Sequence, residues 1–127
     1  MFLASRHNKF TSRIEISTAT QVPHDYLLKV LTLLSSTSIV ESQRGPGGGY
    51  RLAVFPSDLS ALEVVEAVDT IPRITECPLG IPEHEKLCPL HRLLDDASRT
   101  VEEAFARTAI SDLLPKRRPG QCDFPGK

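Results

Sequence analysis

Two cysteines and two histidines follow one another within a short stretch of the chain, and both residue types bind metals. They are Cys77, His84, Cys88 and His91. These four side chains would suit tetrahedral zinc, although the spacing C-x6-H-x3-C-x2-H is not that of a common zinc finger. The alternative is that they are ordinary small and polar residues that bind nothing. Cys122 lies far along the sequence, and three cysteines favour free thiols or metal ligands over a disulfide scaffold.

A glycine-rich segment from Arg44 to Leu52 lies between two apolar stretches that are typical of strands. Because glycine tolerates positive φ and close backbone approach, the segment predicts the tip of a β-hairpin, to which Arg44 and Arg51 give positive charge. A phosphate-binding loop is excluded, since no Lys-Ser/Thr pair follows the glycines and the next segment is a strand. Because a helix-turn-helix pattern precedes it, the hairpin is interpreted as the wing of a winged helix.

No set of residues suited to catalysis can be identified in the chain. A nucleophile with its base and orienting group is missing, and no pair of carboxylates stands out. The acidic pairs Asp95-Asp96 and Glu102-Glu103 are explained more simply as the solvent-exposed face of a helix. We therefore expect that the chain is not an enzyme.

The net charge of −1 conceals an uneven distribution along the chain. Residues 1–57 carry six Lys/Arg against three Asp/Glu, whereas residues 58–114 carry five against twelve. A basic first half followed by an acidic second half favours a protein that binds a polyanion through its first half. Because there is no apolar run of membrane-spanning length and no signal-peptide pattern, we expect the chain to be cytoplasmic.

The first half of the chain predicts two helices and a strand. A short helix is expected from Ile14 to Thr20 and a second from Pro23, as its first residue, to Ser35. The first wing strand is expected from Ile39 to Ser42. The apolar members of the two helices are Ile14, Ile16, Ala19, Tyr26, Leu27, Val30, Leu31, Leu33 and Leu34.

The second half predicts two more helices joined by a loop. Ser60 and Glu63 match a capping box that opens a helix through Asp69, with its buried face on Leu62, Val65 and Val68. The last helix is expected at Pro89 to Ala109. Its apolar stripe consists of Leu90, Leu94, Ala97, Val101 and Phe105. Because so small a chain offers little to cover that stripe, we expect a homodimer.

Together these elements predict a mainly α chain with a small β-hairpin wing. The expected parts are a winged helix-turn-helix DNA-binding domain at residues 1–69, a cysteine-containing loop at 70–87, a dimerisation helix at 88–114 and a basic, disordered tail at 115–127.

The motifs resemble, in order, those of the Rrf-type regulators, the IscR/NsrR/RirA-like bacterial family of winged-helix transcription factors. The segments that carry the resemblance are Val22 to Leu27, Ile39 to Glu41, Arg44 to Tyr50, Leu62 to Asp69 and Cys88 to His91. The resemblance implies a transcriptional regulator that dimerises through its long C-terminal helix. Many members also hold an iron–sulfur cluster in the loop before that helix.

The chain departs from this family at its beginning. Family members begin with a longer helix that packs under the helix-turn-helix, whereas only Met1 to Lys9 precede the second helix here. We therefore expect the undersides of Ile16, Leu27 and Leu31 to be exposed. This would mean either an N-terminally truncated chain or weakened DNA binding.

The metal ligands of the family are only partly present. In cluster-binding relatives the loop carries three cysteines, and in one branch a histidine three residues after the last one is also a ligand. Cys77, Cys88 and His91 match the first cysteine, the last cysteine and that histidine, whereas His84 lies where the middle cysteine is absent. We therefore expect no cofactor, with an iron–sulfur cluster as the alternative.

Double-stranded DNA is the expected partner. The helix that begins at Pro23 should enter the major groove, and the wing should reach the minor groove. The predicted DNA contacts are His24, Asp25, Tyr26, Leu28, Lys29, Arg44, Gly47, Gly48 and Arg51. Tyr26 is equally suited to the core, and Arg51 to a pairing on the wing itself.

A dimer with two such DNA-reading surfaces predicts a palindromic operator with half-sites about one helical turn apart. Two other functions remain open. One is an interaction protein that has lost DNA binding, and the other is a zinc-binding module.

Overall fold

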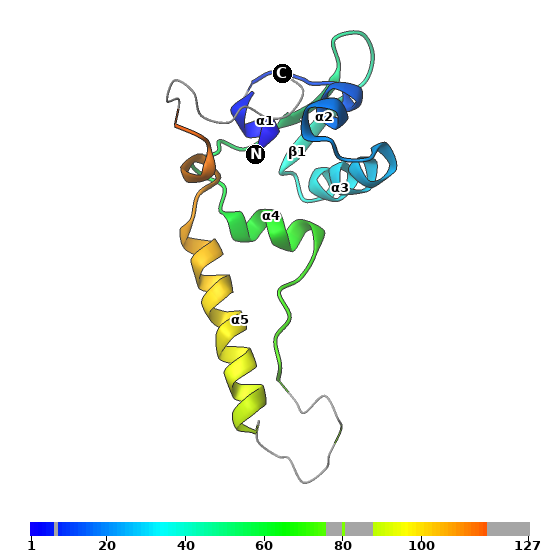
Figure 1. Ribbon diagram of the computed structural model, residues 1–127. Coiled ribbons are helices and arrows are strands. Elements are labelled where there is room, and N and C mark those ends of the chain that lie inside the picture. The colour runs from blue at the N-terminus through cyan, green and yellow to red at the C-terminus, as the bar shows by residue number, and fades with distance from the viewer. Residues whose placement is uncertain (7, 76–79, 81–87, 117–127) are drawn as a thin grey trace.

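The first helices and the hairpin form one body, from which a long helix projects (Figure 1). The computed structural model describes residues 1–6, 8–75, 80 and 88–116. The elements within these residues are α1 (Phe2–Ser5), α2 (Arg13–Thr20), α3 (His24–Ser36), β1 (Val40–Gln43), β2 (Gly49–Leu52), α4 (Ala61–Val68), α5 (Pro89–Arg107) and the 3₁₀ turn η1 (Ile110–Leu113). The predicted class, mainly α with a small hairpin, is confirmed.

α2 forms where the sequence predicts it and is held at both ends. The Ser12 hydroxyl caps its start by accepting a hydrogen bond from the Glu15 N–H at 3.2 Å. Gln21, with a left-handed φ of 58°, ends the helix and redirects the chain toward α3. Ile16 and Ala19 are buried, whereas Ile14, the third apolar member expected for this helix, is 67% exposed. Residues two apart point to opposite sides of a helix.

α3 begins at His24, one residue later than predicted. Pro23 precedes the helix as its N-cap, because its ψ of 141° is extended and not helical. Leu27 and Leu31 are buried in the core, whereas the Tyr26 side chain is 63% exposed. The alternative that Tyr26 is a core residue is therefore wrong.

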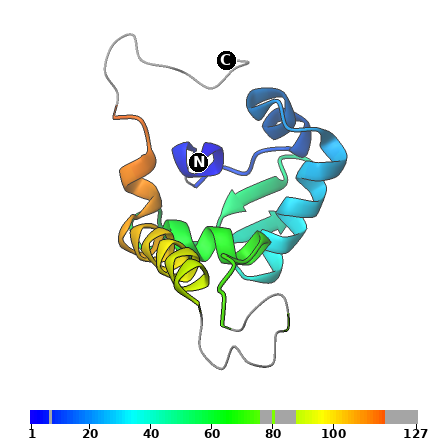
Figure 2. The same ribbon diagram turned by 60° about the horizontal axis from the view of Figure 1, so that its bottom comes forward.

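The expected exposure of the underside of α2 and α3 is also wrong. Ile16, Leu27 and Leu31 are all at least 94% buried. The short helix α1 packs against β2 and α2, and its Phe2, Leu3 and Ala4 belong to the same buried core (Figure 2). One turn of helix thus fills much of the space, because the first three of its four side chains are all apolar and buried. A cavity of about 160 Å³ remains between α1, α3 and the hairpin.

β1 and β2 pair antiparallel, with Val40 opposite Leu52 and Gln43 opposite Gly49. The predicted first strand began one residue too early. Thr11 adds a bridge to the outer side of β2 by exchanging two backbone hydrogen bonds with Tyr50. The segment before α2 therefore ties the base of the wing to the helix-turn-helix.

The capping box of α4 is confirmed, but its buried face is not the predicted one. Ser60 accepts from the Glu63 N–H, and the Glu63 carboxylate accepts from the Ser60 N–H at 2.8 Å. Ala61, Val64 and Ala67 pack against the core. The predicted buried residues are only half-buried or, in one case, exposed: Leu62, Val65 and Val68. Apolar residues occupy much of the circumference of α4. Its sequence therefore offers two candidate buried faces of three residues each, and the structure buries the one that was not predicted.

α5 ends at Arg107, two residues before the predicted end, and the turn η1 that follows was not predicted. The predicted apolar stripe on α5 is exposed along its length, with Leu90 at 60% and Val101 at 45%. Asp95 is the only buried residue of this helix. No helix in the described ranges combines the length and apolarity needed to cross a membrane.

Candidate nucleic-acid interface

The N-terminal turn of α3 presents a polar, solvent-facing surface while the opposite side of the helix is buried. Leu27 and Leu31 hold the helix to the core. The predicted contact residues of this helix are all exposed: His24, Asp25, Tyr26, Leu28 and Lys29. These five side chains are therefore all accessible to a partner on this face of α3.

The turn that connects α2 to α3 is stabilised by a side chain within α2. The Ser17 hydroxyl donates to the Val22 carbonyl at 2.7 Å, so the chain that leaves α2 is fastened back onto it. Together with the left-handed Gln21, this bond fixes the angle between the two helices. The N-terminal turn of α3 is thus presented by a rigid support.

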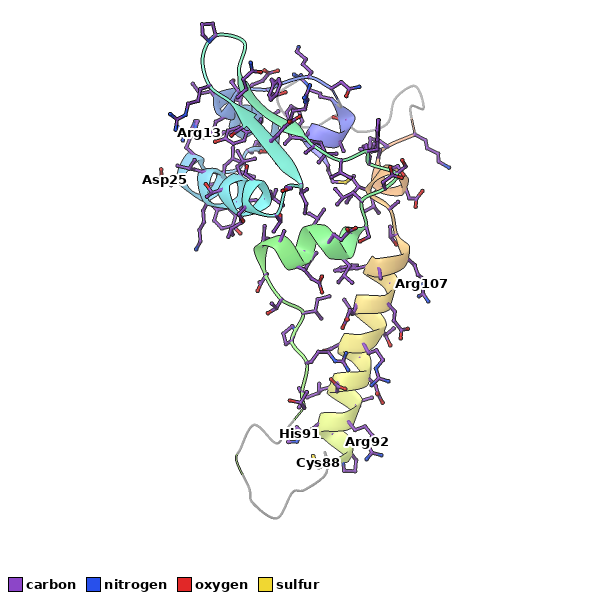
Figure 3. All side chains as sticks on the ribbon, turned by 180° about the vertical axis from the view of Figure 1, so that it is seen from behind. Arg13, Asp25, Cys88, His91, Arg92 and Arg107 are labelled. Atoms are coloured by element: carbon purple, nitrogen blue, oxygen red, sulfur yellow. The ribbon has the colours of Figure 1, made fainter. Side chains whose placement is uncertain are left out.

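Arg13, the first residue of α2, was missed by the sequence reasoning. It is exposed, and Figure 3 places it on the same side of the domain as Asp25 at the start of α3. No ion pair within the described ranges engages it. The available signal was its position directly after the capping Ser12, in the basic first half of the chain.

Arg44 and Arg51 lie in different environments within the wing. Arg44 is exposed at the tip of the hairpin. Arg51 lies on β2, where its Nε donates to the Glu41 carboxylate at 2.7 Å across the strand pair. Its guanidinium also stacks over the ring of Phe10, 4.4 Å from the centroid. Of these two arginines, Arg44 is therefore the one at the tip, and Arg51 is bound within the wing base.

The glycines of the wing bring its backbone close to other chain segments. At Gly49, with φ of 138°, an added Cβ would lie 2.2 Å from the Thr11 carbonyl oxygen. Gly47, with φ of 73°, faces open space at the tip. Gly48 is partly buried, and its N–H donates to the Gly45 carbonyl at 3.0 Å, closing the turn.

Two of the predicted metal ligands, Cys88 and His91, lie at the far end of α5, remote from α3 (Figure 3). Cys88 is the N-cap of α5, and its Sγ lies 3.2 Å from Nδ1 of His91. The structure thus brings Cys88 and His91 together, one turn apart on one helix. Cys77, His84 and Cys122 lie outside the described residues. Within the described ranges no group of three or more metal-binding side chains is gathered.

An ion pair links the chain that follows α4 to the middle of α5. Arg73 Nε donates to Asp95 Oδ1 at 2.7 Å, and its Nη2 donates to Oδ2 at 3.0 Å. The Ile74 N–H donates to the same Oδ1 at 3.2 Å. The Arg73 guanidinium holds the pKa of Asp95 down to about 2, since its hydrogen bonds and charge favour the carboxylate. The prediction that Asp95 lies on the solvent-exposed face of the helix is therefore wrong, because this side chain is buried against Arg73.

Comparison with known sequences gives consistent matches to one group of proteins. The family model Rrf2, described as an iron-dependent transcriptional regulator, matches residues 1–116. The ORF2 protein of Azotobacter vinelandii, an HTH-type transcriptional regulator by its description, is 31% identical over 90% of this chain and 77% of its own length. The HTH-type regulator IscR of Aliivibrio salmonicida is 36% identical over 79% of this chain and 60% of its own length.

Comparison with solved structures gives the same fold. The structure of CymR, the global cysteine regulator of B. subtilis, superposes with a TM-score of 0.70 and 24% identity. The match covers 88% of this chain and 84% of CymR.

Proposed function

The chain belongs to the Rrf2 family of transcriptional regulators, and we propose that it acts as a homodimer on a palindromic operator. Regulators of this family bind DNA and are not enzymes. The observation that carries this proposal is the exposed N-terminal turn of α3, held rigidly beside a wing with an arginine at its tip. Both are needed to read adjacent grooves of one DNA half-site.

The side chains on the first turn of α3 supply the base contacts of this proposal. Asp25 accepts a hydrogen bond from a cytosine amino group, and His24 reaches the neighbouring base edge. Leu28, 40% exposed one turn later, suits the methyl group of a thymine. Tyr26, Lys29 and the N-terminal Arg13 of α2 contact phosphates, which position the protein without specifying sequence.

The wing tip supplies the minor-groove contact. Arg44 enters a narrow A·T-rich groove, where the negative potential is strongest. Gly47 faces open space and allows the backbone to approach the phosphates. At Gly48 an added Cβ would instead lie 2.3 Å from the Gln43 carbonyl oxygen of the wing itself. Arg51 supports the wing through Glu41 and Phe10 and is not assigned to DNA.

A second copy of the chain covers the exposed stripe of α5. Leu90, Leu94 and Val101 are each at least 45% exposed in the single chain, and they share one face of the helix. Side chains that large and apolar stabilise a parallel or antiparallel helix pair when they interdigitate. Dimerisation places two copies of α3 on one DNA molecule, and their two-fold symmetry requires a palindrome.

No cofactor is expected from the sequence, but we propose the alternative: the far end of α5 is a sensing site whose ligand is an iron–sulfur cluster. The described part of the site fits such a group: Cys88 supplies a thiol and His91 an imidazole nitrogen, 3.2 Å apart. Cys77 and His84 complete the proposed ligand set and lie outside the described residues. When bound, the cluster supplies one-electron redox chemistry and sensitivity to oxidants.

Fluorescence anisotropy on a palindromic operator selected from a random, A·T-flanked library tests the DNA-binding part. Asp25→Ala should weaken binding by about 1–3 kcal/mol and relax the preference at one position of each half-site. Ser36→Ala, at the exposed far end of α3, should leave the affinity unchanged. The contrary result is a wild type that enriches no sequence from the library and binds all DNA alike, with an affinity set by the salt concentration. The chain would then be an interaction protein and not a sequence-specific regulator.

A further inference from the structure

α5 is fastened to the winged-helix domain at its C-terminal end. The Ala61 N–H donates to the Thr108 carbonyl at 2.8 Å, and the Ile110 N–H donates to the Leu59 carbonyl at 2.8 Å. These two bonds tie the residues just beyond α5 to the chain just before and at the start of α4. α4 also packs against α5 near this end (Figure 1). Contacts confined to one end of a rod leave the direction of its far end open to change.

The Arg73–Asp95 ion pair is a second attachment, far along the same helix. Asp95 lies thirteen residues before Thr108, which corresponds to about 20 Å of helix. Arg73 belongs to the extended segment that leaves α4 and runs alongside α5 (Figures 1 and 3). A rod held at two separated points has a fixed direction.

The geometry of this pair differs from that of an ordinary surface ion pair. The guanidinium and the carboxylate form two parallel hydrogen bonds, at 2.7 and 3.0 Å, and the Ile74 N–H adds a third donor. The Asp95 side chain is only 12% exposed, and Glu102 Oε2 lies 3.3 Å from Arg73 Nη1. Bidentate pairing of this kind fixes orientation as well as distance.

We propose that Arg73 and Asp95 are positioning residues that set the angle of α5 to the DNA-reading domain, and thereby the half-site spacing that the regulator recognises. The second part rests on the proposed homodimer. Because α5 forms the dimer contact there, a change in its angle moves the two copies of α3 apart or together. Neither residue touches DNA in this scheme.

The chain contains a matched control for this proposal. Arg99 also faces Asp95, with its Nη2 3.8 Å from Oδ2, but both residues belong to α5. Replacing Arg99 therefore removes one positive charge beside the same carboxylate without cutting a link between α5 and the rest of the chain. Arg73→Gln and Arg99→Gln carry the same change in side chain and charge.

The test that is independent of DNA and of dimerisation uses residual dipolar couplings of the backbone amides. In the wild-type chain, one alignment tensor should describe both the winged-helix domain and α5. In Arg73→Gln the couplings of α5 should depart from that tensor, and exchange of the Ile74 amide should accelerate at least about tenfold. Arg99→Gln should match the wild type. Couplings of α5 that are the same in all three proteins would overturn the proposal.

The second measurement compares affinities for operators whose half-sites are moved apart in single base-pair steps. The wild type and Arg99→Gln should prefer one spacing by about fivefold or more, whereas Arg73→Gln should lose that preference while keeping its affinity for a single half-site. An unchanged spacing preference in Arg73→Gln would overturn the link to spacing. A wild type that is monomeric by light scattering would instead refute the proposed homodimer, and the couplings would still decide the role of the ion pair.

Discussion

Thr11 and Tyr50 exchange both of their backbone hydrogen bonds, at 2.9 and 2.8 Å, although they lie thirty-nine positions apart in sequence. This bridge joins the segment that enters α2 to the return strand of the wing. Two parts of the interface that would otherwise move separately are thereby held as one unit. Gly49 lies against this bridge, and its lack of a side chain lets the two backbones meet.

Gly49→Ala should break the bridge and destabilise the chain by at least about 2 kcal/mol. Its Cβ would lie 2.2 Å from the Thr11 carbonyl oxygen, and its φ of 138° is unfavourable for any side chain. Gly47→Ala is the matched control, because its φ of 73° is left-handed but no atom lies within 4 Å. That variant should cost only about 1–2 kcal/mol. Urea unfolding compares them, and equal losses would contradict the steric explanation.

Val101→Glu should convert the dimer to monomer at micromolar concentration. It places a charge in the centre of the exposed stripe, where a partner helix would leave it buried and unpaired. Ala106→Glu, on another exposed face of α5, should remain dimeric. Light scattering measures both. A wild type that is already monomeric at this concentration would contradict the dimer model.

Arg44→Ala should weaken binding to A·T-flanked operators by about 1–3 kcal/mol and to G·C-flanked operators by less. The reason is that groove width, and with it the negative potential, depends on the flanking sequence. Anisotropy titrations on the two operators give the difference. Equal losses on both would make Arg44 a plain phosphate contact, whose removal mainly lowers the dependence of binding on salt.

The depressed pKa of Asp95 predicts a specific acid sensitivity. Its pKa is about 2 in the folded chain against 3.8 ordinarily, so the unfolded chain binds the proton more readily. The contribution of the carboxylate to the free energy of unfolding is therefore fully present above about pH 4 and is lost as the pH falls toward 2. The difference in stability between wild type and Asp95→Asn should shrink over that interval in urea titrations. A difference that is constant from neutral pH to pH 2 would contradict the assignment.

Anaerobically purified wild type should be brown and carry iron and sulfide, both of which Cys88→Ala should lose. The thiolate of Cys88 and the imidazole of His91 are the ligands that the structure brings together. Cys122→Ala is the control, since Cys122 lies outside the cysteine-containing loop in sequence. Visible absorbance with iron and sulfide assays measures the outcome. A colourless wild type that holds zinc would favour the zinc-binding alternative.

Sequence reasoning succeeded where both partners of an interaction are close in the chain. The Ser60–Glu63 capping box spans three residues, and the glycines of the wing lie between two strands that pair directly. Such patterns determine local structure by themselves, since their geometry depends on few residues. The fold class followed from the same local signals.

The errors concern which side of an element faces inward. In α4 it is Val64 and not the predicted Val65 that packs against the core. In α2 the apolar residues also divide between an exposed Ile14 and a buried Ile16. In both helices the apolar residues occupy more than one face, so tertiary contacts decide between them. The Arg73–Asp95 pair joins residues twenty-two positions apart and has no local signature at all. The covering of the core by α1 was missed for a related reason, because one turn of helix is too short for a periodic pattern.

The distance between Cys88 and the first turn of α3 has a thermodynamic consequence. Cys88 and His91 lie at the opposite end of the molecule from Asp25 at the start of α3 (Figure 3). A group bound there would therefore influence the proposed operator contact only by favouring one arrangement of α5 and α4 over another. Such linkage is reciprocal: the factor by which the bound group alters operator affinity equals the factor by which the operator alters affinity for the group. Promoter occupancy would thus set how firmly the regulator holds its own signal.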